Sequence, residues 1–502
     1  MATHTGMSLK SQVAHGLKWQ AISIVGRQVL SLVVFTTLAR LLSPSAFGLI
    51  ALVGVYLGFV SMFIDQGMGM AIIQRPDLEP AHLDTAFWFN VGCALALCLG
   101  TVVLAVPISL IFHEPRLVPL LRCSSVGLII GSSAAIHSSL FTKAMDFRQP
   151  VIRGLIANLV GGIIGIGMAF TGFGVWSLVG QQLASELAGA VFLWSMSTYR
   201  PSLRFSKSHL RQLVGFSSSV FATSILWYFS TRLDQIVIGR FAGISTLGLY
   251  SVANKIPNMA NMVAQEPVAN LSLPALSRLQ ADHEKMRQVI CRGMELAAVV
   301  SFAVFVGLAV VAPDLVPLLF GHQWARAATL CSLLAIYALV NTLGIFCYPV
   351  LLATGGIGKY IWLNVWHFIG VLSVCLVGIQ FSVSWLVLGL IINGVVLSIP
   401  GLMFVHRRIG LSPWDYCRPC LVPAAASIFM VGAVWATGLL IPKSTWLAIV
   451  VFCKMTTGAI AYLGFMYLFK RETLIKLFDM AGHAMGFSFL APQPLAPPLV
   501  KS

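Results

Sequence analysis

The stretch GLKWQAISIVGRQVLSLVVFTTLARLLSPSAFGLIALVGVYLGFVSMFIDQGMGMAIIQR, residues 16–75, decides the fold of this chain. It contains two apolar runs joined by a short Ser-Pro-Ser turn, and each run reaches the roughly 20 residues that a helix needs to cross a bilayer. Arg27 lies near the middle of the first run, and Asp65 lies towards the end of the second. A charged side chain at membrane depth is costly unless it faces protein or water. The stretch therefore predicts a membrane hairpin whose ionisable groups face an interior.

The composition extends this prediction to the whole chain. Hydrophobic residues make up 58% of the sequence and charged residues only 10%, whereas an ordinary soluble domain has about 25% charged residues. About fourteen runs of spanning length follow one another between residues 17 and 469. We expect an all-α polytopic membrane protein with two pseudo-symmetric six-helix lobes and two C-terminal helices.

Two groups of motifs recur about 200 residues apart, as expected for a parallel repeat of helical bundles. Ala39-Arg40 and Phe47-Gly48-Leu49 are matched by Gly239-Arg240 and Leu247-Gly248-Leu249, and Phe112-His113-Glu114-Pro115-Arg116 is echoed by Phe320-Gly321-His322 with Arg326. The most basic loop, 199–212, falls where the repeat begins again. The predicted division is an N-lobe over 1–198, a C-lobe over 199–408, two further helices over 409–470 and a cytoplasmic tail over 471–502.

The formal net charge of +16 is explained by membrane topology. Roughly 22 basic residues fall in loops on one side of the predicted spans and roughly 6 on the other, which places both termini in the cytoplasm by the positive-inside rule. The basic residues form no single stripe of the kind that binds nucleic acid. We therefore expect a protein of the bacterial inner membrane with no nucleic-acid partner.

The sequence has no pattern typical of catalysis, a cofactor or a metal. It lacks a His-Glu-x-x-His motif, a Walker glycine loop and an acidic pair on a polar loop. Cys417 and Cys420 match C-x-x-C in spacing only. We interpret them as small apolar residues that pack between helices. The histidines are scattered, as in His82, His113, His322, His367, His406 and His483. No catalytic residue, cofactor or metal is predicted, and a transporter is favoured over an enzyme.

Ionisable and amide side chains inside the runs are the candidate site. The cations are Arg27, Arg232 and Lys255; the acidic residues are Asp65, Glu186, Asp234 and Glu266; and the amides follow helical spacing at Asn254, Asn258 and Asn261. One interpretation is internal pairing, for example of Arg27 with Asp65 or Asp234. The other is a water-filled central cavity in which the cations bind an anionic headgroup such as a phosphate, the amides meet sugar hydroxyls or make interhelical hydrogen bonds, and the acids couple transport to an ion.

The sequence also resembles a known family. The motifs are GLKWQAIS from Gly16, LARLLSPSAFGLIAL from Leu38, GMAIIQR from Gly69, TAFWFNVG from Thr85, YRPSLRFS from Tyr199, FSSSVFATSILWYFSTRLDQIVIGRF from Phe216, GLYSVANK from Gly248 and PLLFGHQW from Pro317. In these the chain is similar to the Wzx-type polysaccharide flippases of the multidrug/oligosaccharidyl-lipid/polysaccharide exporter superfamily, especially colanic-acid-exporter-like members.

The resemblance implies a flippase that works by alternating access. Its substrate would be an undecaprenyl-pyrophosphate-linked oligosaccharide for exopolysaccharide, capsule or O-antigen, and its partners would be membrane lipids and the polymerase or export machinery. A MATE-like cation-coupled drug antiporter is the alternative, although it would favour a more acidic cavity. A polysaccharide polymerase is less favoured because the outer loops are short.

Overall fold

A computed structural model describes residues 26–65, 68–75, 77–146, 148–213, 218–442 and 444–485, and every regular element in these ranges is helical. A helix over 26–41 comes first. The elements after it are α2 (Pro44–Asp65), α3 (Met68–Gln74), α4 (Pro80–Phe112), α5 (Leu117–Ser124), α6 (Val126–Lys143), α7 (Arg148–Phe170), α8 (Trp176–Met196), α9 (Lys207–Leu213), α10 (Ser218–Val237), the π-helix η1 (Ile238–Ala242), α11 (Ile244–Ala264) and α12 (Glu266–Ser277). The remainder are α13 (His283–Phe320), the 3₁₀ turn η2 (His322–Trp324), α14 (Ala325–Asn341), η3 (Thr342–Gly344), α15 (Cys347–Ala353), α16 (Ile357–Gly378), α17 (Val383–Ile409), α18 (Pro413–Cys417), η4 (Arg418–Cys420), α19 (Leu421–Leu440) and α20 (Leu447–Met485).

Large apolar side chains cover the outside of these helices. Val103 on α4 is 72% exposed and Leu440 on α19 is 83% exposed, which suits a protein surrounded by lipid and not by water. Ten helical segments in the described ranges are long and apolar enough to cross a membrane. The all-α polytopic prediction is confirmed, while the number fourteen stays a prediction.

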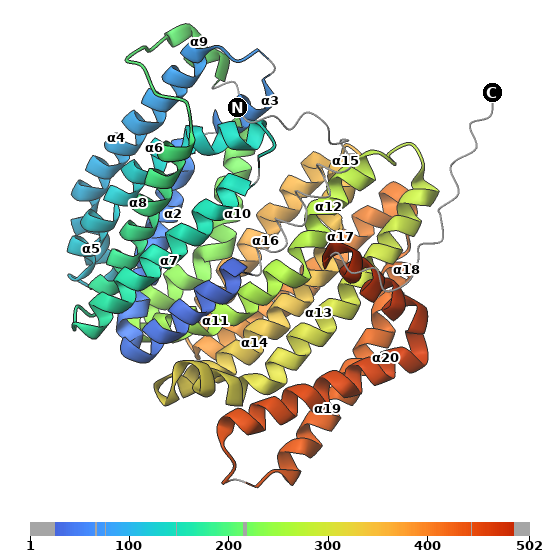
Figure 1. The fold of residues 1–502 in the computed structure, drawn as a ribbon. Helices are drawn as coiled ribbons and strands as arrows, with labels where there is room; N and C mark the ends of the chain where they lie inside the picture. The colour runs from blue at the N-terminus through green and yellow to red at the C-terminus, as the bar shows by residue number, and fades with distance from the viewer. Residues whose placement is uncertain are drawn as a thin grey trace, which may run out of the picture.

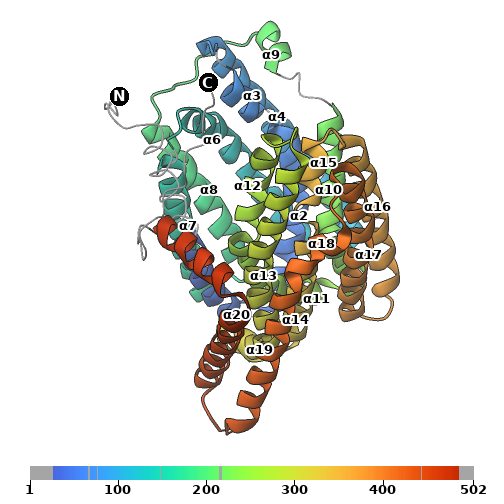
Figure 2. The ribbon, with the colours of Figure 1, turned by 90° about the vertical axis from the view of Figure 1, so that its right-hand side faces the viewer.

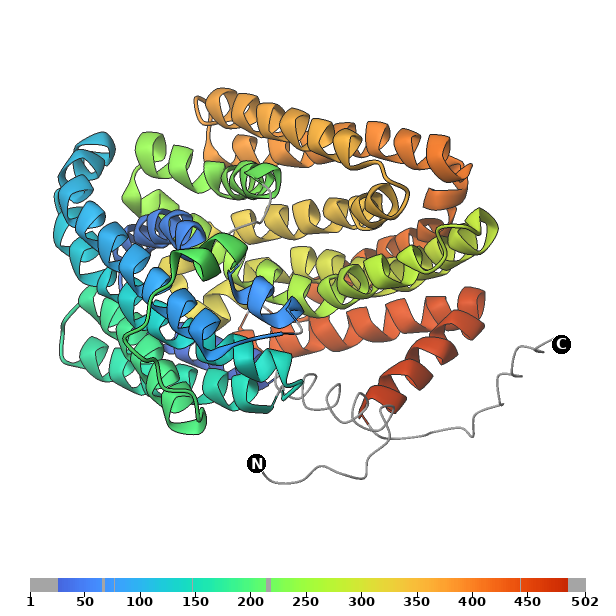
Figure 3. The ribbon, with the colours of Figure 1, turned by 90° about the horizontal axis from the view of Figure 1, so that it is seen from above.

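The helices form two groups and an appendage. Helices α4 to α8 pack on one another and on α2, whereas α10, α11, α13, α14, α16 and α17 pack among themselves. Figure 1 shows the first group in blue and teal and the second in green to orange, and Figure 3 shows them side by side from above. The helices α19 and α20 pack on each other and on α13 (Figure 2).

The repeat motifs meet where the two groups touch. A Cβ added to Gly48 on α2 would lie 1.9 Å from the Ile244 carbonyl oxygen, and one added to Gly248 on α11 would lie 1.8 Å from the Pro44 carbonyl oxygen. Gly48 thus contacts the first residue of α11, and Gly248 contacts the first residue of α2. Adding 200 to the residue numbers of the Gly48 side of the crossing gives those of the Gly248 side. The crossing has the form of a local two-fold axis, as the sequence repeat predicts.

The largest hydrophobic core lies at the same end of the bundle, where residues 42–43 join helix 26–41 to α2; we call this the hairpin end. Phe47 meets the Trp324 ring edge-on with centroids 5.4 Å apart, and Phe35 meets Phe320 at 5.6 Å. Trp324 and Phe320 are fully buried. Aromatic pairs of this geometry stabilise a core beyond their area alone, so the two groups of helices are held together at the hairpin end.

The helices end at residues suited to ending them. The Asp282 carboxylate accepts a hydrogen bond from the Lys285 backbone N–H and so begins α13, while Gly321, with φ of 100°, ends it. A positive φ of this size is strained in any residue with a Cβ. The glycine therefore allows the sharp turn that brings Trp324 into the hairpin-end core.

Candidate functional site

A broken helix carries most of the predicted site. Helix α11 ends at Ala264, Gln265 has φ of −114°, and α12 continues from Glu266. The buried Gln265 amide donates 2.8 Å hydrogen bonds to the Ala338 carbonyl and the Thr342 hydroxyl. Irregular backbone at membrane depth is stable only where protein or water satisfies its polar groups. Gln265 thus supports the break structurally, although its spacing continues the asparagine row.

Lys255 on α11 points across to helix 26–41. Its Nζ donates a 3.2 Å hydrogen bond to the Ser31 hydroxyl and lies 5.1 Å from the centre of the Phe35 ring. No acidic partner for it is found among the described residues, so the intramembrane cation is held by a hydroxyl and a ring alone. Its charge therefore stays available to an anion at the boundary between the two groups.

The three predicted asparagines lie on α11 near Lys255. Asn258 is exposed, and Asn254 and Asn261 are half-buried. Within the described residues, none of the three amides makes a hydrogen bond. Interhelical hydrogen bonding was the structural interpretation of these three asparagines. It is not observed in the described part of the chain.

The other two predicted cations lie apart from Lys255. Arg27 lies against Gly154 on α7, where an added Cβ would be 2.9 Å from the arginine Cδ. Arg232 is exposed on α10, one turn after Tyr228, whose hydroxyl donates to the Val55 carbonyl across the boundary. The three cations share the boundary region without forming one cluster.

Asp234 is the acidic residue with the most complete surroundings. Tyr250, which is 1% exposed, donates a hydrogen bond from its hydroxyl to the Asp234 carboxylate, and the Gln235 backbone N–H donates another at 2.7 Å. Tyr337 and Cys375 lie close enough to interact with its charge. No lysine or arginine forms an ion pair with it within 4.0 Å in the described ranges, although Arg232 lies close enough to interact with its charge. The residue 200 positions earlier, at the matching place in the repeat, is Val34. The first group of helices therefore has no counterpart of the Asp234 carboxylate at that position.

A cavity of about 270 Å³ lies beside this cluster. Its polar lining includes Asn341, Tyr348, Asn364 and His367, from α14 to α16. A Cβ added to Gly394, which lines the cavity, would lie 3.9 Å from the Tyr337 ring. The cavity and the Asp234 cluster are therefore neighbours through Tyr337, an arrangement the sequence alone did not predict.

Glu186 on α8 lies near a cation that was not among the predicted site residues. Gln182 donates to its Oε1 at 3.2 Å, and Arg153 of α7 is close enough to interact with its charge. The Arg153 Nε and the Glu186 Oε2 are both buried without a hydrogen bond among the described residues. Arg153 was missed because it stands only a few residues inside the apolar run.

The remaining predicted acids are less informative. Glu266 is exposed at the first residue of α12. Asp65 ends α2, but its side chain lies outside the described residues, and so a pair between Arg27 and Asp65 is not tested. A different acid, Asp314 of α13, forms a 2.5 Å ion pair with Lys454 of α20, both partly buried. This pair fastens the appended helices to α13.

Two family-like motifs, TAFWFNVG and YRPSLRFS, pack against each other at the opposite end of the bundle, which we call the linker end because residues 197–206 lie there. The Tyr199 hydroxyl and the Ser202 backbone N–H donate to the Asp84 carboxylate at 2.8 and 3.1 Å. Trp88 donates from its indole N–H to the Ser202 carbonyl. Burial, helped by Asp84, raises the pKa of the Tyr199 hydroxyl far above its usual range, so it stays a donor. The linker between the two groups is thus bound to α4.

Comparison with known proteins fits these features. The family described as "Polysaccharide biosynthesis protein" matches residues 37–329. The chain belongs to this family. The match covers nearly the same region as the motifs from which the family resemblance was inferred.

Its relatives include named transport and biosynthesis proteins. The succinoglycan biosynthesis transport protein ExoT of Rhizobium meliloti (strain 1021) is 29% identical over 326 residues, which cover 64% of this chain and 66% of the relative. The lipopolysaccharide biosynthesis protein WzxC of Escherichia coli (strain K12) is 27% identical over 340 residues, covering 67% and 69%. The chain thus aligns with about two thirds of the length of these curated relatives.

Solved structures share the fold. The lipid II flippase MurJ in an inward closed conformation superposes with a TM-score of 0.74 at 15% identity, covering 90% of this chain and 99% of that one. An inward-facing multidrug resistance MATE transporter gives 0.59 at 15% identity, covering 76% and 94%. At these identities the likeness concerns the fold alone. The chain is a multi-pass membrane protein built on the fold of these transporters.

Proposed function

We propose that this protein is a flippase that moves a lipid-linked anionic oligosaccharide from the cytoplasmic to the outer leaflet of the bacterial inner membrane. The observation that carries the proposal is the α11 face, where Lys255 has no acidic partner and three asparagine amides have no protein hydrogen bond in the described region. Fixed positive charge beside free amides suits a phosphorylated sugar. The relatives named as polysaccharide transport and biosynthesis proteins support the same substrate class.

The proposed route is a central cavity between two lobes, divided as the sequence predicts at 198, with helices 13 and 14 after 408 and a tail after 470. Helix α11 contacts α2, whereas its continuation α12 packs mainly on α11, α13 and α15 of its own group. The two groups of helices are therefore in contact at the hairpin end, whereas α12 makes few contacts with the first group. We place the linker end in the cytoplasm, as the basic loops indicate, and propose that the substrate enters the route from that side.

Asp234 is the acid we propose for ion coupling, in preference to Asp65, Glu186 and Glu266. A carboxylate largely withdrawn from water and without an ion-pair partner favours protonation or a bound ion. The neighbouring cavity offers a path by which a proton or cation reaches the cluster. In the Asp234→Asn variant, transport should either stop or no longer depend on the concentration of the coupling ion. In the control variant Tyr228→Phe, transport should depend on that ion as it does in the parent. An unchanged ion dependence in Asp234→Asn would remove the residue from this role.

The experiment that tests the function deletes the gene and measures surface polysaccharide together with lipid-linked repeat units. Loss of the polymer with repeat units trapped on the cytoplasmic leaflet is expected. Charge reversal at Arg27, Arg232 or Lys255 should fail to restore export, and Lys207→Glu on the linker should restore it. Normal polymer in the deletion strain, or rescue by all three reversed variants, would contradict the flippase or the cavity respectively.

A further inference from the structure

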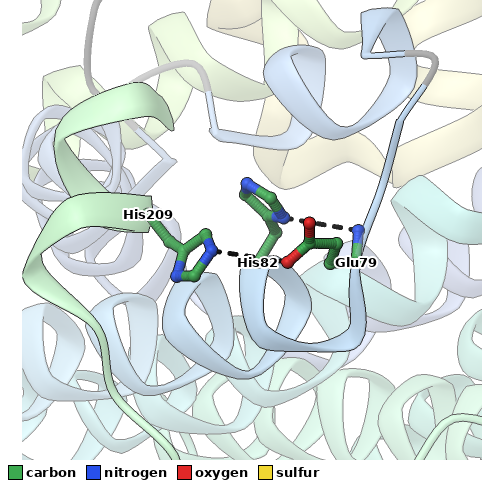
Figure 4. A group of neighbouring side chains, drawn as sticks. All are labelled: Glu79, His82 and His209. Atoms are coloured by element: carbon green, nitrogen blue, oxygen red, sulfur yellow. Dashed lines mark hydrogen bonds and ion pairs between the residues drawn. The ribbon is translucent and has the colours of Figure 1, made fainter.

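Two histidines and a glutamate meet at the linker end (Figure 4). Glu79 precedes the first residue of α4, His82 lies in its first turn, and His209 comes from α9. Each side chain offers one ligand atom, and these atoms all lie within 4.8 Å of one another. This cluster was not predicted from the sequence, because His209 lies far along the chain from the other two residues.

The start of α4 orients two of these side chains. Glu79 and His82 form a capping box, in which the Glu79 backbone N–H donates to His82 Nδ1 at 3.3 Å. Glu79 is the N-cap residue, with extended backbone, and the capping box holds its side chain and that of His82 together at the start of α4. His82 is 2% exposed, which fixes its ring in place.

His209 is brought to this helix start by contacts that do not involve the cluster. The Ser206 backbone N–H donates to the Thr85 hydroxyl at 3.2 Å, and the Asp84 carboxylate holds the linker further upstream. His209 then packs its ring edge-on against His82 with centroids 4.3 Å apart, and its Nε2 lies 3.6 Å from the Glu79 Oε2. The backbone thus preorganises the three groups.

One ring nitrogen has no protein partner. His209 Nδ1 is buried and makes no hydrogen bond within the described part of the chain. A buried polar atom without a partner is unusual in a folded protein. Because Nε2 is the ring nitrogen that faces Glu79, Nε2 is the ligand atom that His209 offers, and Nδ1 is left for an outer-shell partner.

We propose that Glu79, His82 and His209 bind a divalent transition-metal ion of the zinc class. Imidazole nitrogen and carboxylate oxygen are ordinary zinc ligands at about 2.0–2.2 Å, so the donor atoms of a tetrahedral site lie about 3.3 Å apart. The 3.6 Å separation between His209 and Glu79 needs only a small closure. Two nitrogen donors disfavour Mg²⁺ and Ca²⁺, which prefer oxygen.

The bound ion would join α9 to α4 and so fasten the linker to the first group of helices. Chain residues after α9 lead to α10, which carries Arg232 and Asp234. An ion that binds only this arrangement stabilises it in proportion to occupancy. The site is independent of the proposed substrate, because it lies at the linker end away from Lys255.

The test uses the purified full chain in nanodiscs, stripped of metal and titrated with Zn²⁺ in competition with a chromophoric chelator, and with Co²⁺ followed by its visible absorption. We expect one ion per chain. His209→Ala and Glu79→Gln should weaken binding roughly tenfold or more, because loss of even an outer-shell partner has an effect of that size. His283→Ala, an exposed histidine at the start of α13, is the matched control and should bind as the parent does.

A second readout locates the ion and guards against a misfolded variant. Zn²⁺ should slow tryptic cleavage after Arg204, Lys207 and Arg211 in the parent chain and in His283→Ala, but not in His209→Ala, with all three eluting as monodisperse protein. Absence of stoichiometric binding would overturn the proposal. Equal affinity in the parent and His209→Ala, or equal protection of the linker, would overturn it too.

Discussion

At the scale of single residues, an intramembrane charge is informative through its partners. Lys454 has a carboxylate partner, Asp314, and so serves structure. Lys255 has a hydroxyl and an aromatic ring instead. A cation near a ring face gains about 0.5–2 kcal/mol, which offsets only part of the cost of its depth. A bound anion would offset the rest of the free-energy cost of placing the Lys255 charge at this depth.

Replacing Lys255 separates the two roles. Lys255→Gln should lower export of polysaccharide at least about tenfold, because a charge-assisted hydrogen bond to a phosphate contributes roughly 1.5–3 kcal/mol, while the thermal midpoint of the purified protein changes little. Lys255→Arg should keep most of the export. Surface polysaccharide and scanning fluorimetry measure the two quantities.

Ser31→Ala is the control for this prediction, since it removes the hydrogen bond to Lys255 and keeps the charge. It should export normally. A large loss of thermal stability in Lys255→Gln, with export reduced only in step with protein abundance, would show that Lys255 holds helices together and does not bind substrate.

At the scale of elements, the α2–α11 crossing depends on two glycines. Gly48→Ala or Gly248→Ala should each destabilise the protein by about 1–3 kcal/mol, the usual cost of overpacking, because the new Cβ meets backbone carbonyls that cannot move aside. The two variants should have similar effects, since the contacts exchange across the local two-fold axis. Thermal unfolding measures both.

Gly54→Ala is the matched control, because Gly54 lies on the same helix α2 and an added Cβ there has nothing within 4 Å. It should be neutral or slightly stabilising, as expected from helix propensity. If Gly48→Ala unfolded at the same temperature as Gly54→Ala, the tight crossing would be refuted.

The appended helices provide a second prediction at this scale. Lys454→Met should leave Asp314 as a partly buried charge without its partner and weaken the docking of α19 and α20 on α13. The exchanged variant Lys454→Asp with Asp314→Lys should recover part of the loss. Limited proteolysis of the loop around residue 442 measures docking, and equal cleavage in all variants would contradict a docking role for the pair.

These elements also show what sequence can and cannot predict. Apolar length predicted the helices, and the motifs 200 residues apart predicted a repeat, since bilayer thickness sets the length of a spanning helix; that Gly48 and Gly248 cross each other was seen only in the structure. The Asp234–Tyr250 bond and the approach of His209 to His82 were not predicted. Those contacts depend on which faces of distant helices meet. Helix contacts of that kind cannot be predicted from the pattern of a single sequence.

At the scale of the whole molecule, the hairpin end is the contact that the proposed transport cycle must open. Arg40 donates from its guanidinium to the Leu319 and Leu318 carbonyls at the end of α13, at 2.8 and 2.5 Å. Trp324 and Gln323 each donate to the Ala39 carbonyl at 2.8 Å. The contact is not symmetric, because the repeat-related Arg240 lies over the Phe241 ring instead, 5.4 Å from its centre.

This asymmetry makes a final prediction with a built-in control. Arg40→Gln removes the charged hydrogen bonds that join helix 26–41 to α13, and a loss of about 1.5 kcal/mol shifts the closed-to-open ratio roughly tenfold. A cysteine placed at the buried Ala46 should therefore react faster with a membrane-impermeant thiol reagent in Arg40→Gln. Arg240→Gln changes the same residue type at the repeat position and should leave that rate unchanged. Equal acceleration by both substitutions would mean that surface charge alone controls access, and no acceleration by either would mean that the Phe47–Trp324 core closes the hairpin end without help from Arg40.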